Sequence, residues 1–170
     1  MSKTRISLTV LFAVLSILWM SVIFGFSANN ADKSAEQSHG VVELIMKLFV
    51  PGFSDMDEVQ QEELIAKYDR PVRKVAHFTS YALLGFLLYL CFGSPKWLPD
   101  KKTIPIVLAF PLCVIFAFSD EYHQTMVEGR AGRFSDVMID SGGAIFGIVI
   151  AIAAVCIVTV HLKRRDNLVK

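Results

Sequence analysis

Ionisable side chains are concentrated in residues 120–140, DEYHQTMVEGRAGRFSDVMID, between two strongly apolar stretches of the chain. This segment carries five carboxylates, one histidine and two arginines. A charge at the centre of a bilayer costs on the order of 2.5–3.5 kcal/mol, and somewhat less near its edge. So many ionisable groups next to apolar runs therefore indicate a cluster that binds, catalyses or forms ion pairs.

Three kinds of chemistry are open to these residues. Arg130 and Arg133 have the forked guanidinium group that matches a phosphate or a carboxylate. His123 or His77 could act as a general base, with Asp120 or Asp136 orienting the imidazole. The spacing Asp120-x-x-His123 is that of half a carboxylate-bridged di-metal site, but the sequence holds a single copy. We therefore favour an ion-pair network over a metal site, and we expect no cofactor.

Polar residues recur at helical spacing along the apolar runs that flank this segment. Lys74, His77 and Tyr81 are separated by three and four residues, and Asp136 and Asp140 by four. At 100° per residue, each set lies on one face of a helix. Ionisable groups at membrane depth face the bundle interior and pair with one another. We therefore expect one ligand-binding cluster formed by Lys74, His77, Tyr81, Asp120, Glu121, His123, Gln124, Arg130, Asp136 and Asp140.

Four apolar runs are long enough to place these residues in a membrane. They cover residues 6–26, 72–93, 103–124 and 136–161. About 20 helical residues span the ~30 Å hydrocarbon layer. The third run is apolar only as far as Ser119 and reaches that length if its helix continues through residues 120–124. Pro105 and Pro111 would kink this helix without ending it. With 54% hydrophobic residues, the chain is expected to be an all-α membrane protein, a four-transmembrane-helix bundle forming one domain over residues 1–170.

The lysines and arginines predict the orientation of these spans. They are Lys3 and Arg5 before the first run, Lys96, Lys101 and Lys102 between the second and third, and Lys163, Arg164, Arg165 and Lys170 after the fourth. The positive-inside rule then places both termini in the cytoplasm of a plasma-membrane protein. The first run exceeds the 7–15 apolar residues of a signal peptide, which favours a retained helix. The polar cluster would face outward.

The external segment, residues 27–71, is expected to form two short amphipathic helices. An apolar stripe within residues 41–49 ends at Pro51-Gly52, and Ser54 followed by Asp57 resembles a capping box for a second helix. Pro71 would then open the second span, since proline is tolerated at a helix start. These helices could lie on the membrane interface as a lid, or merely connect two spans.

Other functional classes find little support in the composition. The net charge of +1 and the lack of a basic cluster on a polar face argue against nucleic-acid binding. Cys91, Cys113 and Cys156 lie inside apolar runs, where packing is the simplest role. The partner that the sequence indicates is the lipid bilayer, and the oligomeric state stays open.

Three stretches resemble the VanZ-like family: KVAHFTSYALLGFLL at 74–88, residues 120–147, and WMSVIFGFSANN at 19–30. Glu128 and Asp140 depart from the family pattern, where proline and asparagine are common. The resemblance implies a multi-pass cell-envelope protein, and one relative confers resistance to the glycopeptide teicoplanin.

Two functions remain open at this point. The first is binding of an anionic ligand, including a lipid-linked one, at the outer leaflet, with an effect on glycopeptide susceptibility. The alternative is a membrane-embedded hydrolase or transferase acting on a lipid-linked phosphate, with the histidines named above as candidate bases.

Overall fold

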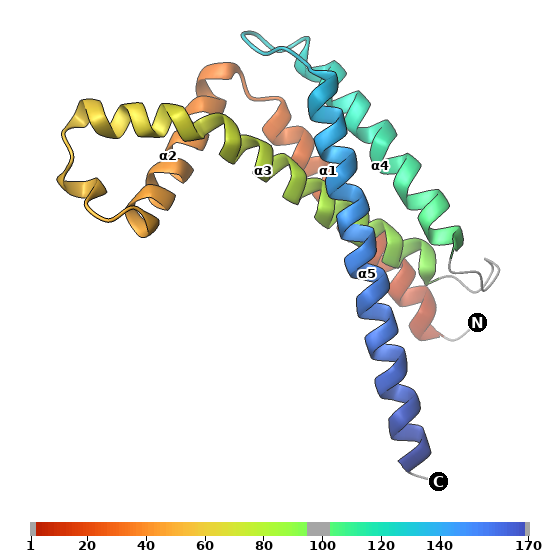
Figure 1. Cartoon of the computed structure of the whole chain (residues 1–170). Helices are drawn as coiled ribbons and strands as arrows, with labels where there is room; N and C mark the ends of the chain where they lie inside the picture. Colours follow the sequence, from red (N-terminus) through yellow and green to blue (C-terminus); the bar gives the residue numbers. More distant parts are fainter. Residues whose placement is uncertain (1–2, 95–102, 169–170) are drawn as a thin grey trace.

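The computed structural model describes residues 3–94 and 103–168, and over these residues the chain is helical without strands (Figure 1). The elements are α1 (Lys3–Ser27), α2 (Ala31–Phe49), the 3-10 turn η1 (Phe53–Asp55), α3 (Glu58–Gly93), α4 (Thr103–Gln124) and α5 (Phe134–Leu168). Helices α1, α3, α4 and α5 are long and apolar enough to cross a membrane. The expected all-α membrane architecture with four spans is confirmed.

Glycines bring the backbones of α3 and α5 into direct contact. A Cβ atom added at Gly143 would lie 2.2 Å from the carbonyl oxygen of Phe78, and one at Gly147 would lie 1.7 Å from that of Ala82. Small residues at an interval of four allow two membrane helices to approach this closely. The spacing of α3 and α5 is therefore set by backbone contact and leaves little room for adjustment.

Residues 31–70, which form α2, η1 and the first part of α3, make an arm that projects sideways from the bundle (Figure 1). The arm has a small core of its own around Val42, Met46 and Phe53. Its two helices are joined at Asp69, whose carboxylate accepts hydrogen bonds from Ser38 and, at 2.7 Å, from Arg73. The arm is therefore a packed helical unit and not a loose connection.

The start of the second span differs from the sequence expectation. Helix α3 begins at Glu58, capped by the Asp57 side chain, which accepts a hydrogen bond from the Gln60 amide at 2.8 Å. It then continues through Pro71 for 36 residues without a break. Lys67, whose carbonyl loses its hydrogen bond to Pro71, is exposed, so water can satisfy that group. The second external helix and the second span are thus one helix, and Pro71 does not open it.

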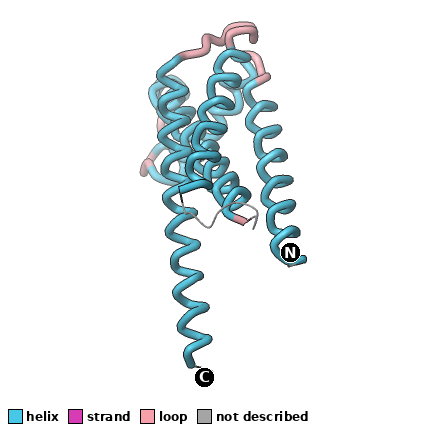
Figure 2. The backbone as a smooth tube through the Cα atoms, turned by 90° about the vertical axis from the view of Figure 1, so that its right-hand side faces the viewer, coloured by secondary structure: helices cyan, strands magenta, loops and turns pink. Residues whose placement is uncertain are grey.

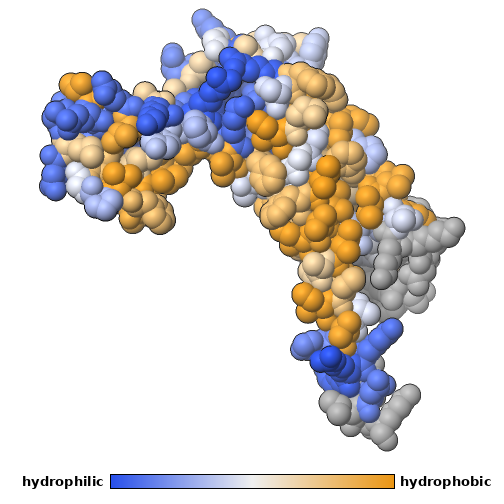
Figure 3. Space-filling model, in the orientation of Figure 1, coloured by the Kyte–Doolittle hydropathy of each residue, from blue (hydrophilic) through white to orange (hydrophobic). Residues whose placement is uncertain are grey.

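Polar and apolar surfaces are separated along the bundle. Hydrophilic residues gather where the arm meets the bundle and again near the C-terminal end of α5, with an apolar band between them (Figure 3). The loop between α4 and α5 lies at one end of the bundle, and both termini lie toward the opposite end (Figure 2). Helix α5 projects past the other helices at that opposite end (Figure 2). Four spans place both termini on one side. Lys96, Lys101, Lys102 and Lys170, on which the predicted orientation partly depends, lie outside the described residues.

Candidate functional site

The loop between α4 and α5 folds back over the end of α4, and two glycines make this possible. Gly129 adopts a left-handed conformation with φ of 74°, and a Cβ at Gly132 would lie 2.2 Å from the carbonyl oxygen of Glu121. The backbone amide of Arg133 donates a 2.8 Å hydrogen bond to Glu121 Oε2. Arg130 Nη1 donates to the carbonyl oxygen of Ser27 at 3.3 Å, which joins the loop to the end of α1.

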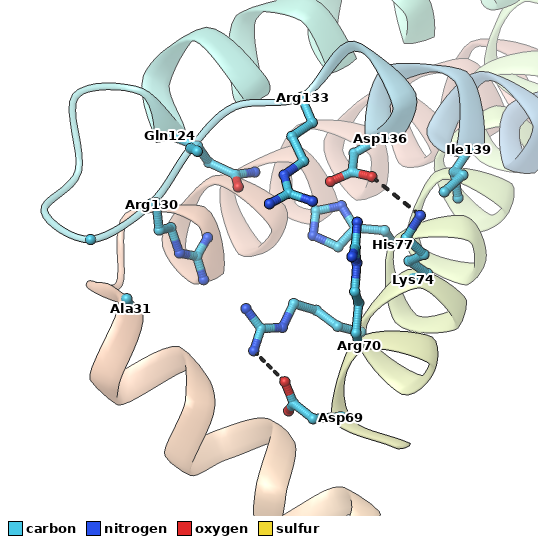
Figure 4. A pocket seen from close by; sticks show the side chains of 13 residues that line it. Ala31, Asp69, Arg70, Lys74, His77, Gln124, Arg130, Arg133, Asp136 and Ile139 are labelled. Carbon is cyan, nitrogen blue, oxygen red and sulfur yellow. Dashed lines mark hydrogen bonds and ion pairs between the residues drawn. The ribbon is translucent and has the colours of Figure 1, made fainter. Parts of the chain in front are cut away.

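A basic cleft of about 320 Å³ lies between this loop and helices α3 and α5 (Figure 4). Its charged lining consists of five cations, Arg70, Arg73, Lys74, Arg130 and Arg133, and two acids, Asp69 and Asp136, together with His77. Arg130 and Arg133 extend from the loop toward α3 (Figure 4). The excess of guanidinium groups makes this cleft suited to an anion.

The cations of the basic cleft are only partly neutralised by its acids. Arg73 pairs with Asp69 at 2.7 Å, and Lys74 Nζ lies 3.8 Å from Asp136 Oδ1. Within the described residues, the other three arginines form no ion pair. Burial and the nearby positive charge of Arg73 lower the pKa of Arg130 from its ordinary value, but a guanidinium stays charged in proteins. Three fixed positive charges are therefore available to a ligand.

An apolar groove of about 300 Å³ adjoins the basic cleft between α1, α2 and α3. Apolar side chains line most of it, namely Trp19, Val22, Ile23, Phe26, Val41 and Val72. The groove and the cleft share Arg73, His77 and Arg130 as lining residues. A charged compartment therefore opens onto an apolar one at these three side chains.

Three carboxylates are buried next to these two compartments, and one of them, Asp120, lines the groove. Asp120 and Asp140 are fully buried and Glu121 is 5% exposed. His77 Nδ1 lies 3.4 Å from Asp140 Oδ1, and Gln124 Nε2 donates to Asp120 Oδ2 at 3.4 Å and to Glu121 Oε1 at 3.3 Å. No lysine or arginine of the described chain forms an ion pair with any of the three acids.

The stretch of sequence that carries these features matches a known protein family. The model of the VanZ/LLP1 family matches residues 12–157, a stretch that contains every residue of the cleft, the groove and the buried acids. The chain belongs to the VanZ/LLP1 family. The resemblance drawn from three short stretches is thereby confirmed over most of the chain. Neither a search of curated proteins nor a search of solved structures gave a match.

The structure places the predicted site residues of this VanZ/LLP1 chain at two levels. Lys74, His77, Gln124, Arg130 and Asp136 line the basic cleft, and Tyr81, Asp120, Glu121 and Asp140 are buried. The buried Tyr81 lies within electrostatic range of all three of those acids.

His123 is the predicted residue that lies apart. Its ring stacks on Phe24 of α1, with 4.4 Å between the ring centroids, and it does not line the cleft. In the described chain, the three residues that offer ligand atoms within 4.8 Å of one another are His77, Glu121 and Asp140. Asp120 and His123, the pair singled out from the sequence, are not part of this group.

Sequence reasoning missed Arg70 and Arg73, which contribute to the cleft from α3. With Lys74 and His77 they occupy a helical face at intervals of three and four residues. Arg73 lies within the predicted second span and could have been included, whereas Arg70 joins this face only if the helix continues through Pro71.

Proposed function

We propose that this VanZ/LLP1 protein binds the anionic head group of a lipid-linked ligand at the outer leaflet of the plasma membrane, and thereby affects glycopeptide susceptibility. The observation that carries the proposal is the basic cleft, with its three unpaired arginines opening onto the apolar groove. The glycopeptide context comes from the family resemblance. The positive-inside rule predicts that the basic cleft faces the outer leaflet.

The two compartments match the two parts of such a ligand. Guanidinium groups at the cleft would bind a phosphate or carboxylate through paired N–H donors. The groove lined by α1 and α2 would hold the first part of a hydrocarbon chain, and Arg130 stands at the boundary between both. The arm supports this placement, because Leu44, Leu48 and Phe49 are exposed on α2 and would sit among lipid head groups and upper chains.

A binding measurement tests the proposal. Purified protein is titrated with a long-chain lipid phosphate and, in parallel, with neutral phosphatidylcholine, and bound lipid is counted by native mass spectrometry. Arg130→Lys keeps the charge but loses the fork, so affinity for the lipid phosphate should fall about tenfold, the equivalent of one charged hydrogen bond. Arg164→Lys, at the far end of α5, is the matched control and should bind like the wild type.

The same variants are then compared in cells for teicoplanin susceptibility. Arg130→Lys should lose most of any protection that the wild-type chain gives, and His123→Ala should lose little. If Arg130→Lys binds the lipid phosphate as tightly as wild type and protects equally, the cleft is not the binding site.

One observation favours a second function, hydrolysis or transfer on a lipid-linked phosphate. His77 lines the basic cleft while its Nδ1 lies near Asp140 Oδ1, and a carboxylate in that place orients an imidazole to act as a base. The orienting acid is then Asp140, where the sequence had suggested Asp120 or Asp136. Under this function, His77→Ala abolishes phosphate release from the lipid phosphate while the lipid still binds. No release by the wild type would exclude it.

A further inference from the structure

We propose that His77, Glu121 and Asp140 bind one divalent transition-metal cation, of the zinc or manganese class, beneath the basic cleft. These residues come from α3, α4 and α5, so the ion would join three of the four spans. The proposal does not depend on the anion site above. It also departs from the sequence expectation, which favoured ion pairs over a metal and considered a different pair of residues.

The geometry of the three side chains comes close to that of a coordination shell. One ligand atom from each lies within 4.8 Å of the others. Atoms that bind one zinc ion at 2.0–2.2 Å are roughly 3–4 Å apart. Side-chain rotations that move each ligand atom by less than about 1 Å therefore bring the three atoms to binding distance. The backbone contacts between α3 and α5 meanwhile hold the Cα atoms of His77 and Asp140 in place.

The charge of this region requires compensation. Glu121 and Asp140 are buried among membrane-spanning helices without an ion-pair partner from any described lysine or arginine. Buried charges are ordinarily paired or coordinate a metal, because burying them alone is costly. A divalent cation bound by Glu121 and Asp140, with neutral His77 as the third ligand, forms a site with no net charge.

Unused polar atoms give a second, independent indication. Asp140 Oδ2 is buried without a hydrogen bond, Oδ1 has only its 3.4 Å contact with His77 Nδ1, and the hydroxyl of the fully buried Tyr81 has no partner. Tyr81 stands one helical turn beyond His77 on the same face of α3 and within electrostatic range of Glu121 and Asp140. Buried polar groups nearly always have partners, and an ion with its bound water would supply them here.

Hydrogen bonds from neighbouring groups also hold one of the proposed ligands in place. The Oε2 atom of Glu121 accepts a hydrogen bond from the Arg133 backbone amide, and its Oε1 atom accepts one from the Gln124 side chain. Such hydrogen bonds orient a carboxylate ligand and leave lone pairs for the ion. His77 keeps 26% of its side chain exposed toward the cleft, so the site can be reached. An imidazole with two carboxylates suits zinc or manganese better than magnesium or calcium.

Metal analysis of the full-length protein tests the proposal. The protein is purified through a tag that contains no histidine, treated with chelator, dialysed against zinc or manganese alone, and measured by elemental mass spectrometry. One ion per chain is expected, together with a higher unfolding temperature in the presence of the metal. Asp140→Asn and Glu121→Gln should each weaken binding by more than about tenfold, because removing a ligand costs more than removing its supporting hydrogen bond.

Asp120→Asn is the matched control, because Asp120 is a buried acid next to Glu121 that does not belong to the three ligands. Its metal affinity should fall much less than that of the two ligand variants. Should a ligand variant fail to fold, the other one and the wild-type titration still decide. Less than one ion per wild-type chain, equal binding by all variants, or equal loss in Asp120→Asn would each overturn the proposal.

Discussion

Gly143→Ala tests whether backbone contact between α3 and α5 determines the geometry of the site. Gly143 follows Asp140 by three residues on α5, and the atom it would strike belongs to Phe78, the neighbour of His77 on α3. The added Cβ would lie 2.2 Å from the Phe78 carbonyl oxygen, whereas ordinary contacts begin at 3.4 Å. The two backbones must therefore separate by about 1.2 Å at this level, the difference between those two distances.

The expected cost follows from a comparison with the adjacent glycine. A Cβ at Gly142 would meet nothing closer than a ring carbon of Phe78 at 3.8 Å, which is ordinary contact. Both substitutions gain the helix propensity of alanine, about 1 kcal/mol. Only Gly143→Ala carries the strain of overpacking, typically about 1–3 kcal/mol. Gly143→Ala should therefore be less stable than Gly142→Ala by about 1–3 kcal/mol.

Stability can be measured by titrating the protein in mixed micelles with a denaturing detergent and following helical circular dichroism. Gly142→Ala should unfold at the same or a higher detergent fraction than wild type, and Gly143→Ala at a clearly lower one. Equal stability of the two variants would refute the claim that α3 and α5 touch at Gly143.

Two further predictions concern the side of the protein that the positive-inside rule predicts to be external. In a chain whose three cysteines are replaced, the exposed position Glu128→Cys should react with an impermeant thiol reagent on intact cells; labelling only after lysis would reverse the predicted orientation. Asp69→Asn should speed amide hydrogen exchange in α2 while leaving α5 unchanged, because the hydrogen bonds from Ser38 and Arg73 are weakened by about 1–3 kcal/mol. Unchanged protection of α2 would show that the arm is held by its apolar core alone.

The four spans could be predicted because apolar length is a direct requirement of the bilayer. Even the extension of α4 through its terminal charged residues to Gln124 followed from the length that a span needs. The helix start at Asp57 was harder to predict, because Ser54 and Asp57 are both residue types that cap helices. Only the packing of Phe53 in the arm core decides between them, by holding Ser54 in the turn before α3.

The site was less accessible to sequence reasoning, because neighbouring positions on one helix face different partners. Asp120 and His123 are three residues apart, and that rotation of about 60° in α4 directs His123 toward Phe24 on α1. The contact between Glu121 and the Arg133 amide depends on the path of the loop, which the positive φ of Gly129 allows. Helical periodicity gives the angle between Asp120 and His123, but it does not give the helix that each residue faces or the path of the loop.

The continuity of α3 also determines how this protein can be divided for engineering. A cut at Pro71 would leave a new helix start at which the first backbone amides after the proline lack partners, within one turn of Lys74. A chimeric junction there would place the boundary between two proteins inside one helix. Either change would also separate Asp69 and Arg70 from the segment that carries the other α3 residues of the cleft. The smallest unit that can be exchanged between homologues therefore runs from Ala31 to Gly93, arm and span together.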